Sequence, residues 1–188
     1  MKTLLLVLSL ISYFSSKAQV ATADRQTTKQ VWAVKPLPLE NNEIVYADNI
    51  SLSGYSHDEL FKNVLDWYNN NFKTADTKLS VENKEQGAIS GSGVIHYGQN
   101  ALENGPQNIF FTFSVQLGGA GYSYRFYDIY SMVNGEKISY RDMYREENHP
   151  TTSIKPHWTH KYRYEALSDM DSFMILAINQ FKKYIKRK

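Results

Sequence analysis

The chain has 188 residues, with 21 lysines and arginines, 19 aspartates and glutamates, and no cysteine. This length suits one domain, and the lack of cysteine excludes disulfide bonds, thiolate metal sites and a cysteine nucleophile. The formal net charge of +2 gives no general basis for binding nucleic acid or a membrane surface. The hydrophobic share of 42% and the aromatic share of 14% argue against a disordered chain.

The first eighteen residues have the features of a cleaved signal peptide. Lys2 precedes an apolar run over residues 3–14, and Ser16 and Ala18 supply the small residues of a signal-peptidase site. The run is too short to cross ~30 Å of hydrocarbon, and no later stretch of the sequence reaches the ~18 apolar residues of a membrane-spanning helix. The sequence therefore predicts a periplasmic or extracellular chain that begins at Gln19. Cleavage would remove two of the 21 basic residues and leave 19 basic and 19 acidic ones.

The rest of the chain divides into a linker and one domain. Residues 19–42 are polar and interrupted by Pro36 and Pro38, which is typical of an extended linker. An ordered domain is expected over residues 43–188.

Periodic patterns of apolar residues predict seven secondary-structure elements in this domain. The first is a strand over residues 43–52. Ser56 and Glu59 then form a capping box, which opens a helix that runs to about Phe72. Four strands with alternating apolar residues follow, and the last element is a helix with an apolar residue at every third or fourth position. These strands are expected over residues 77–83, 87–97, 108–117 and 122–133, and the helix over residues 168–185.

One long segment lacks such a pattern. Residues 136–165 show no sustained periodicity, so a long loop is expected there, and long loops inside compact domains are usually functional. In the strand over residues 87–97, Gly91 and Gly93 share a face with apolar residues and leave room for close packing.

The order of elements, β-α-β-β-β-β-α, predicts an α+β fold. Strands joined by short turns form an antiparallel sheet, and the broad apolar faces of both helices must be covered. We therefore expect an antiparallel β-sheet with two helices packed on one of its faces.

The stretch from Ile44 to Val133 resembles a bacterial secreted family known as domain of unknown function 4468. The resemblance covers about half of the chain, and the element order also resembles the TATA-binding-protein-like (TBP-like) fold. The family resemblance implies a TBP-like fold and a signal peptide. It implies no activity and no catalytic residue. The matching motifs are Ser56-His57-Asp58-Glu59-Leu60, Trp67, Gly87-Ala88-Ile89-Ser90-Gly91 and Arg125-Phe126.

A DNA-binding protein of that fold uses a basic, exposed sheet face with apolar wedges. Arg125 is the only basic residue in the last two predicted strands. The sequence therefore predicts no nucleic-acid partner.

Three histidines and one aspartate are the side chains that could carry chemistry. His157 and His160, with His149 and Glu146 or Glu147, could form a zinc site if the loop folds on itself. The alternative is a polar loop whose histidines bind nothing. This is the interpretation that we favour, and it predicts no metal and no cofactor. Asp128 is expected on the same face as Tyr122 and opposite Arg125, without a second carboxylate at a defined spacing. The sequence therefore predicts no enzyme.

Aromatic side chains are concentrated between residues 122 and 164. Aromatics with a polar tip serve at interfaces and carbohydrate platforms, although half of those on a strand normally face the core. The predicted contact residues are Tyr122, Tyr124, Phe126, Tyr130 and Trp158.

The last seven residues, 182–188, hold five positive charges. They complement the dipole at the end of a helix, and they could also contact anionic lipid or an acidic partner at the periphery of a membrane.

Together these features predict an exported soluble domain that acts as a non-catalytic binding or envelope-associated module. Its contact surface would be the exposed sheet face and the 136–165 loop, and its partner a protein, a glycan or a small apolar ligand. One alternative is a helix-grip carrier that holds a small apolar molecule between the sheet and the C-terminal helix. The other is a metal-dependent hydrolase that uses the histidine loop.

Overall fold

The computed structural model describes residues 35–72, 74, 76–97, 108–133, 135–148 and 159–187. The predicted signal peptide and the linker as far as residue 34 lie outside these residues, so both stay predictions. The described elements are β1 (Leu39–Glu40), β2 (Glu43–Ile44), β3 (Tyr46–Ser51), α2 (His57–Asn71), β4 (Leu79–Asn83), β5 (Ala88–His96), β6 (Asn108–Gly118), β7 (Gly121–Val133), β8 (Glu136–Ser139), α3 (Tyr140–Asn148) and α4 (His160–Ile185).

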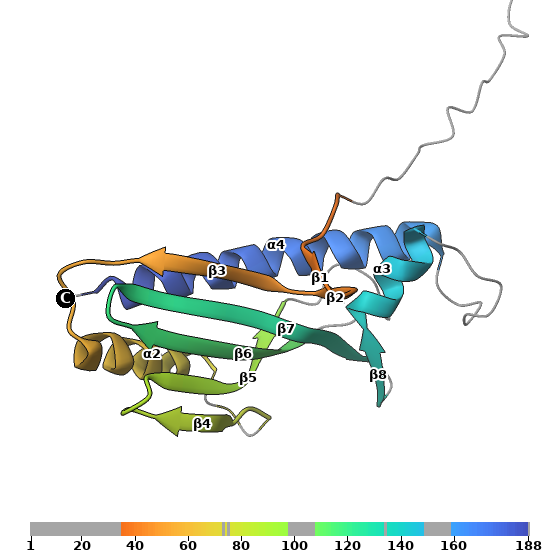
Figure 1. Ribbon diagram of the computed structural model, residues 1–188. Coiled ribbons are helices and arrows are strands. Elements are labelled where there is room, and N and C mark those ends of the chain that lie inside the picture. The colour runs from red at the N-terminus through yellow and green to blue at the C-terminus, as the bar shows by residue number, and fades with distance from the viewer. Residues whose placement is uncertain are drawn as a thin grey trace, which may run out of the picture. The chain divides into compact units, whose positions relative to one another are not determined.

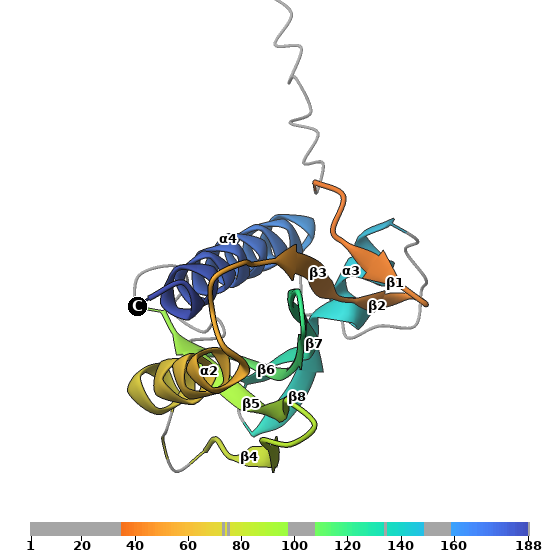
Figure 2. The ribbon, with the colours of Figure 1, turned by 60° about the vertical axis from the view of Figure 1, so that its left-hand side comes forward.

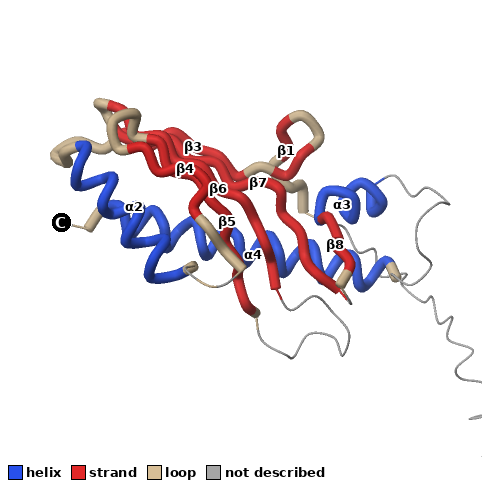
Figure 3. Tube along the Cα trace, turned by 90° about the horizontal axis from the view of Figure 1, so that it is seen from below, coloured by secondary structure: helices blue, strands red, loops and turns tan. Residues whose placement is uncertain are grey.

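The main sheet is antiparallel and has the strand order β3-β7-β6-β5-β4. One edge of β7 is shared by two strands, because β3 pairs with Gly121–Phe126 and β8 pairs with Tyr130–Val133. At the opposite edge of the sheet, the pairing of β4 with β5 shifts register between Leu79 and Val81. Helices α2 and α4 lie on one face of the sheet, and α3 lies beside β8 (Figures 1 and 2). Seen from below, the strands lie in front of both long helices, so neither of these two helices covers the other face of the sheet, which we call the open face (Figure 3).

The predicted α+β fold is confirmed, but the number of helices is wrong. The first helix and the four central strands lie within two residues of their predicted bounds. Part of the segment predicted to be a loop over residues 136–165 is regular: it forms β8, α3 and the first turns of α4. The predicted strand over residues 43–52 is also divided at Val45, because β2 pairs with β1 and β3 pairs with β7.

The ordered domain starts before residue 43, the boundary expected from the sequence. Asn41 and Asn42 adopt left-handed backbone angles, with φ of 51° and 65°, and thereby turn β1 back onto β2 in a short hairpin. Leu37 is buried in the core, and the Val45 amide donates a hydrogen bond of 3.0 Å to the Pro38 carbonyl. This hairpin lies beside β7 and α3 (Figure 2).

The core lies between the sheet and the two long helices. Alternation in β6 and β7 directs every second side chain inward, and the register pairs Phe113 with Phe126. Helix α2 begins at the predicted capping box, in which the Glu59 amide donates to Ser56 Oγ and the Ser56 amide donates to the Glu59 carboxylate. Helix α4 closes the core with buried side chains along one stripe, which are Ala166, Leu167, Met170, Met174, Ala177, Ile178, Phe181 and Ile185.

The expected close packing at Gly91 and Gly93 is confirmed. A Cβ atom at Gly93 would lie within 3.0 Å of three atoms of the Phe111 ring, and one at Gly91 would lie 3.1 Å from the Phe113 ring. The two glycines therefore let the aromatic rings of β6 lie across β5.

The Tyr122 hydroxyl is buried and, within the described part of the chain, has no hydrogen-bond partner. Burial raises the pKa of this phenol to about 12, whereas its value in the unfolded chain is near 10. The unfolded state therefore loses its proton first. The contribution of Tyr122 to stability is complete below about pH 10 and declines as the pH rises toward 12.

The Tyr122→Phe variant is expected to be as stable as the wild type at pH 7, or more stable by up to about 1 kcal/mol, because it removes an unpaired buried hydroxyl. It should also lose less stability between pH 7 and pH 11. Urea unfolding at both pH values measures this, with Tyr124→Phe for comparison because the Tyr124 side chain interacts with Lys182. A loss of more than about 1 kcal/mol at pH 7 in Tyr122→Phe would show that the hydroxyl has a partner.

Candidate functional site

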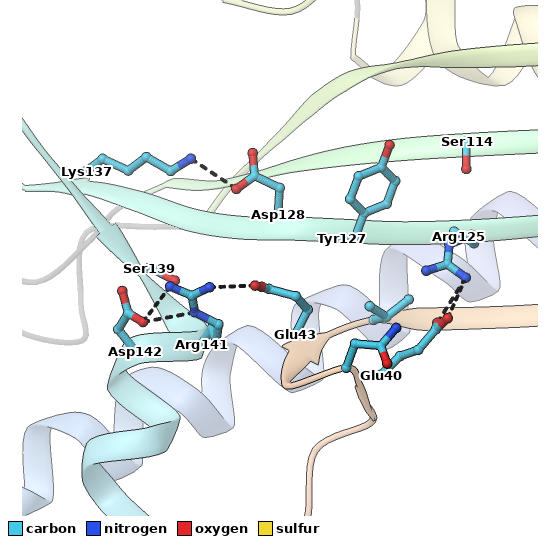
Figure 4. A pocket seen from close by; sticks show the side chains of 12 residues that line it. Glu40, Glu43, Ser114, Arg125, Tyr127, Asp128, Lys137, Ser139, Arg141 and Asp142 are labelled. Atoms are coloured by element: carbon cyan, nitrogen blue, oxygen red, sulfur yellow. Dashed lines mark hydrogen bonds and ion pairs between the residues drawn. The ribbon is translucent and has the colours of Figure 1, made fainter.

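A hollow of about 680 Å³ lies on the open face of the sheet. It is bounded by β7, β8, the β1–β2 hairpin and the start of α3 (Figure 4). At this point the strand that pairs with this edge of β7 changes from β3 to β8. Its walls therefore come mainly from two parts of the sequence that are far apart, the β1–β2 hairpin and the continuous stretch from β7 to the start of α3.

Three groups of charged side chains line this hollow. Arg125 Nη1 lies 2.9 Å from Glu40 Oε2, and Lys137 Nζ lies 3.0 Å from Asp128 Oδ1. Arg141 joins Glu43 at 2.5 Å and Asp142 at 2.9 Å. The hydrogen bond to Glu43, followed by the one to Asp142, raises the pKa of the Arg141 guanidinium. These seven side chains are half-exposed, so they hold one another in place while still facing solvent.

A β-bulge brings Asp128 into the hollow. Tyr127 pairs with Thr112 and Tyr130 pairs with Phe110, so β7 has one residue more than β6 over this interval. Asp128 takes up the extra length in a left-handed conformation with φ of 49°. Tyr127 and Asp128 consequently project from the same side of β7 (Figure 4). The prediction that Asp128 lies on the Tyr122 face is wrong, because alternation breaks at the bulge and Asp128 is exposed beside Arg125 and Tyr127.

A second hollow of about 260 Å³ continues across the sheet toward β4. It shares Ser114 and Arg125 with the first hollow. Its lining combines polar side chains on adjacent strands, including Ser90, Ser114 and Ser123, with apolar residues such as Val81 and Ala88. We call the two hollows together the open-face groove.

The side chains of three of the five predicted contact residues lie on the covered face of the sheet, although Tyr124 also borders the second hollow. Tyr122 and Tyr124 are each 4% exposed and Phe126 is 0% exposed, and all three contact Phe181 of α4. Their prediction as part of an exposed surface is wrong, because their side of β7 is the one that the helices cover. Their rings fill space between the sheet and α4, where a helix-grip carrier would hold its ligand.

The other two contact residues have different positions. Tyr130 is half-buried on the open side, where it stacks on Phe110 with ring centroids 5.1 Å apart, and Lys137 Nζ lies 4.0 Å from the centroid of its ring. Trp158 lies outside the described residues.

The candidate histidine site, which the sequence offered only as an alternative, is described only in part. His149 and His157 lie outside the described residues, whereas His160 Nε2 lies 2.6 Å from Glu147 Oε1. Arg163 Nε contacts the other carboxylate oxygen of Glu147 at 2.9 Å. Among the described residues, no three histidine or acidic side chains lie close enough together to hold a metal ion. Glu147 thus joins the end of α3 to the first turn of α4.

Replacing Glu147 with glutamine is expected to lower the free energy of unfolding by about 1–3 kcal/mol, because its side chain is 4% exposed and accepts a hydrogen bond from the charged Arg163 guanidinium. Urea unfolding measures the loss. Glu165→Gln is the matched control, since its pair with Lys161 is more exposed and 3.7 Å long, and it should cost less than about 0.5 kcal/mol. Equal effects in both variants would contradict a specific role for Glu147.

The basic C-terminal end of α4 is attached to the start of α2. Tyr55 Oη donates to the Lys186 carbonyl at 2.6 Å, and Asn63 Nδ2 donates to the carbonyls of Ile185 and Arg187 at 3.0 and 2.8 Å. These bonds occupy carbonyls that have no partner inside the helix. Lys182 Nζ also lies 3.2 Å from Asp48 Oδ2.

No helix in the described part of the chain combines the length and the apolar character needed to cross a membrane.

Comparisons with known proteins bear on this fold. Residues 46–131 match the model of a family described as "Domain of unknown function (DUF4468) with TBP-like fold". A crystal structure of a DUF4468 family protein from Bacteroides ovatus is similar, with a TM-score of 0.57 and 14% identity over 81% of this chain and 91% of that one. No curated protein matches the chain.

A TBP-like protein from Parabacteroides distasonis is also similar, with a TM-score of 0.51 and 12% identity over 77% of this chain and 96% of that one. At these identities the likeness concerns the fold alone. The family resemblance predicted from the sequence over residues 44–133 is therefore confirmed over residues 46–131, which match the DUF4468 model, and the similar solved structures share the TBP-like fold.

Proposed function

We propose that the chain is an exported, non-catalytic binding module of the cell envelope that holds its ligand in the open-face groove. The observation that carries this proposal is the groove itself, because among the described residues one sheet face is covered by helices and the other is open and hollowed. Its larger part, about 680 Å³, has the size of ligand pockets, which occupy ~300–1,000 Å³. The predicted signal peptide at residues 1–18 supports export.

The arrangement of charges favours binding over catalysis. Each carboxylate of the groove lies within 3.0 Å of a cation. Arg125 pairs with Glu40, and Lys137 pairs with Asp128. Arg141 contacts both Glu43 and Asp142. A carboxylate that moves protons in catalysis usually lies in a site that displaces its pKa, through burial or a like charge. Half-exposed ion pairs instead present fixed donors and acceptors to a ligand.

Sedimentation with the bacterial envelope tests this proposal. The protein purified after export is mixed with envelopes of the producing bacterium, and the bound fraction is measured in the pellet. The variant Glu40→Ala/Arg125→Ala removes one wall of the groove without changing the net charge. It is expected to lower the bound fraction at least fivefold at a protein concentration below half-saturation.

The matched control is Lys62→Ala/Asp66→Ala, which removes an ion pair of the same 2.9 Å length from the exposed face of α2. Exposed pairs contribute only ~0–1 kcal/mol to stability, so both variants should stay folded. The control should sediment like the wild type. The proposal fails if the wild-type protein remains in the supernatant, or if the groove variant sediments as well as the control.

A further inference from the structure

We infer that the ligand of the open-face groove is a neutral oligosaccharide, an inference that rests on the proposed function. Three features of the groove support this ligand class, and each comes from a different set of side chains.

The first feature is the floor of the groove. Ser90 of β5, Ser114 of β6 and Arg125 of β7 lie side by side across three strands, and Gln116 and Ser123 form the next row. Ser90, Ser114 and Ser123 all line the second hollow. Serine hydroxyls both donate and accept hydrogen bonds, so this row matches the mixed donors and acceptors of sugar hydroxyls.

The second feature is the pairing of charges along the walls. Arg125 and Glu40 are 46% and 45% exposed, so each keeps N–H groups or lone pairs for a ligand after their mutual contact. Planar groups of this kind can bind two neighbouring hydroxyls at once. The groove contains three cations and four carboxylates, so its charge nearly cancels. A polyanion such as nucleic acid requires an excess of cations, and a neutral ligand does not.

The third feature is the aromatic surface at the end of the groove. Tyr127 lies between Arg125 and Asp128 along β7 (Figure 4), and the stacked rings of Phe110 and Tyr130 lie on the same side of the sheet. A sugar ring has an apolar C–H face that can stack on an aromatic ring. Tyrosine combines such a ring with a polar tip.

A protein partner fits the groove less well. Extended peptides usually bind to the edge of a sheet, where free backbone groups supply most of the hydrogen bonds. In the open-face groove the backbone of β5, β6 and β7 is already paired, so only side chains are available to a ligand.

Chemical treatment of the envelope distinguishes these ligand classes in the same sedimentation assay. Periodate cleaves the vicinal diols of sugars, and after quenching and washing it should lower binding of the wild-type protein at least fivefold. Digestion of the envelope with protease should leave binding unchanged. Raising NaCl from 50 to 500 mM should change it less than twofold, because a neutral ligand is not held by net charge.

One variant tests whether the periodate-sensitive binding takes place in the open-face groove. Tyr127→Ala should lower binding to the untreated envelope at least fivefold, whereas Tyr184→Ala on α4, the matched control, should bind like the wild type. If Tyr127→Ala does not fold, the amide NMR shifts of the wild-type protein with periodate-sensitive envelope oligosaccharides decide the question, since they should change on β5–β7 and not on α4.

The possible failures are distinguishable. Binding that survives periodate, is lost after protease or falls steeply with salt overturns the oligosaccharide and leaves the proposed function in place. NMR shift changes confined to α4 would place the ligand outside the groove and overturn both proposals. Absence of binding to the untreated envelope overturns both proposals.

Discussion

Replacing Trp67 with alanine is expected to lower the free energy of unfolding by about 3–5 kcal/mol. Trp67 is 1% exposed and joins the helical layer to the sheet. Its ring centroid lies 4.7 Å from that of Phe181, 4.9 Å from that of Phe72, 5.3 Å from that of Phe113 and 6.0 Å from that of Phe126. Alanine would leave a cavity between rings that belong to α4, the end of α2, β6 and β7, and such a cavity closes only partly.

Urea unfolding followed by circular dichroism measures this loss. Asn69→Ala provides the control, because Asn69 is exposed on the same helix and should change stability by less than about 0.5 kcal/mol. If Trp67→Ala costs less than about 1 kcal/mol, the core must be able to collapse around the missing ring, and Trp67 does not join the two layers.

Replacing Gly121 with alanine is expected to cost about 3 kcal/mol or more, through backbone strain and a direct clash. Gly121 begins β7 with φ of 149°, and a Cβ atom there would lie only 1.9 Å from the Ile50 carbonyl oxygen. That oxygen belongs to β3, so the clash would push apart the start of the β3–β7 pairing. A fixed backbone atom cannot move aside as a flexible side chain can.

Gly119→Ala tests whether this effect is specific. Gly119 lies in the same turn, and an added Cβ would meet nothing within 4 Å. Thermal unfolding should therefore show a much lower midpoint for Gly121→Ala and a midpoint close to that of the wild type for Gly119→Ala. Similar midpoints for the two variants would contradict the close approach of β3 at Gly121.

The parts of the fold that could be predicted are those with long periodic patterns. Strand β6 shows strict alternation over eleven residues, and α4 carries one apolar stripe. Strand β8 has four residues and α3 has nine, with few apolar side chains. They are too short to give a clear period, and they depend on tertiary contacts such as the burial of Tyr140. Short elements of this kind cannot be read from local pattern alone.

The candidate site was less predictable, because distant residues form it. Glu40 and Arg125 are 85 positions apart, and Glu43 and Arg141 are 98 apart. Alternation along β7 places Tyr122, Tyr124 and Phe126 on one face, as observed, but it does not show that the helices cover this face. The bulge at Asp128 depends on the pairing of β7 with β6, so alternation along β7 alone cannot place the residues beyond it. One signal was present in the sequence: Arg125 is a lone basic residue on the polar side of a strand whose other side is aromatic.

The register shift in β4 bears on whether two copies of the protein can pair edge to edge. A strand at the edge of a sheet presents unpaired N–H and C=O groups, which can template pairing with another molecule. Strand β4 has only five residues, and its irregularity lies between Leu79 and Val81. A short, irregular edge offers a poor template, so two copies should not join edge to edge into a continuous sheet, even though Val81 is exposed. The irregularity that weakens one strand pair thereby helps to keep the open face of each molecule available.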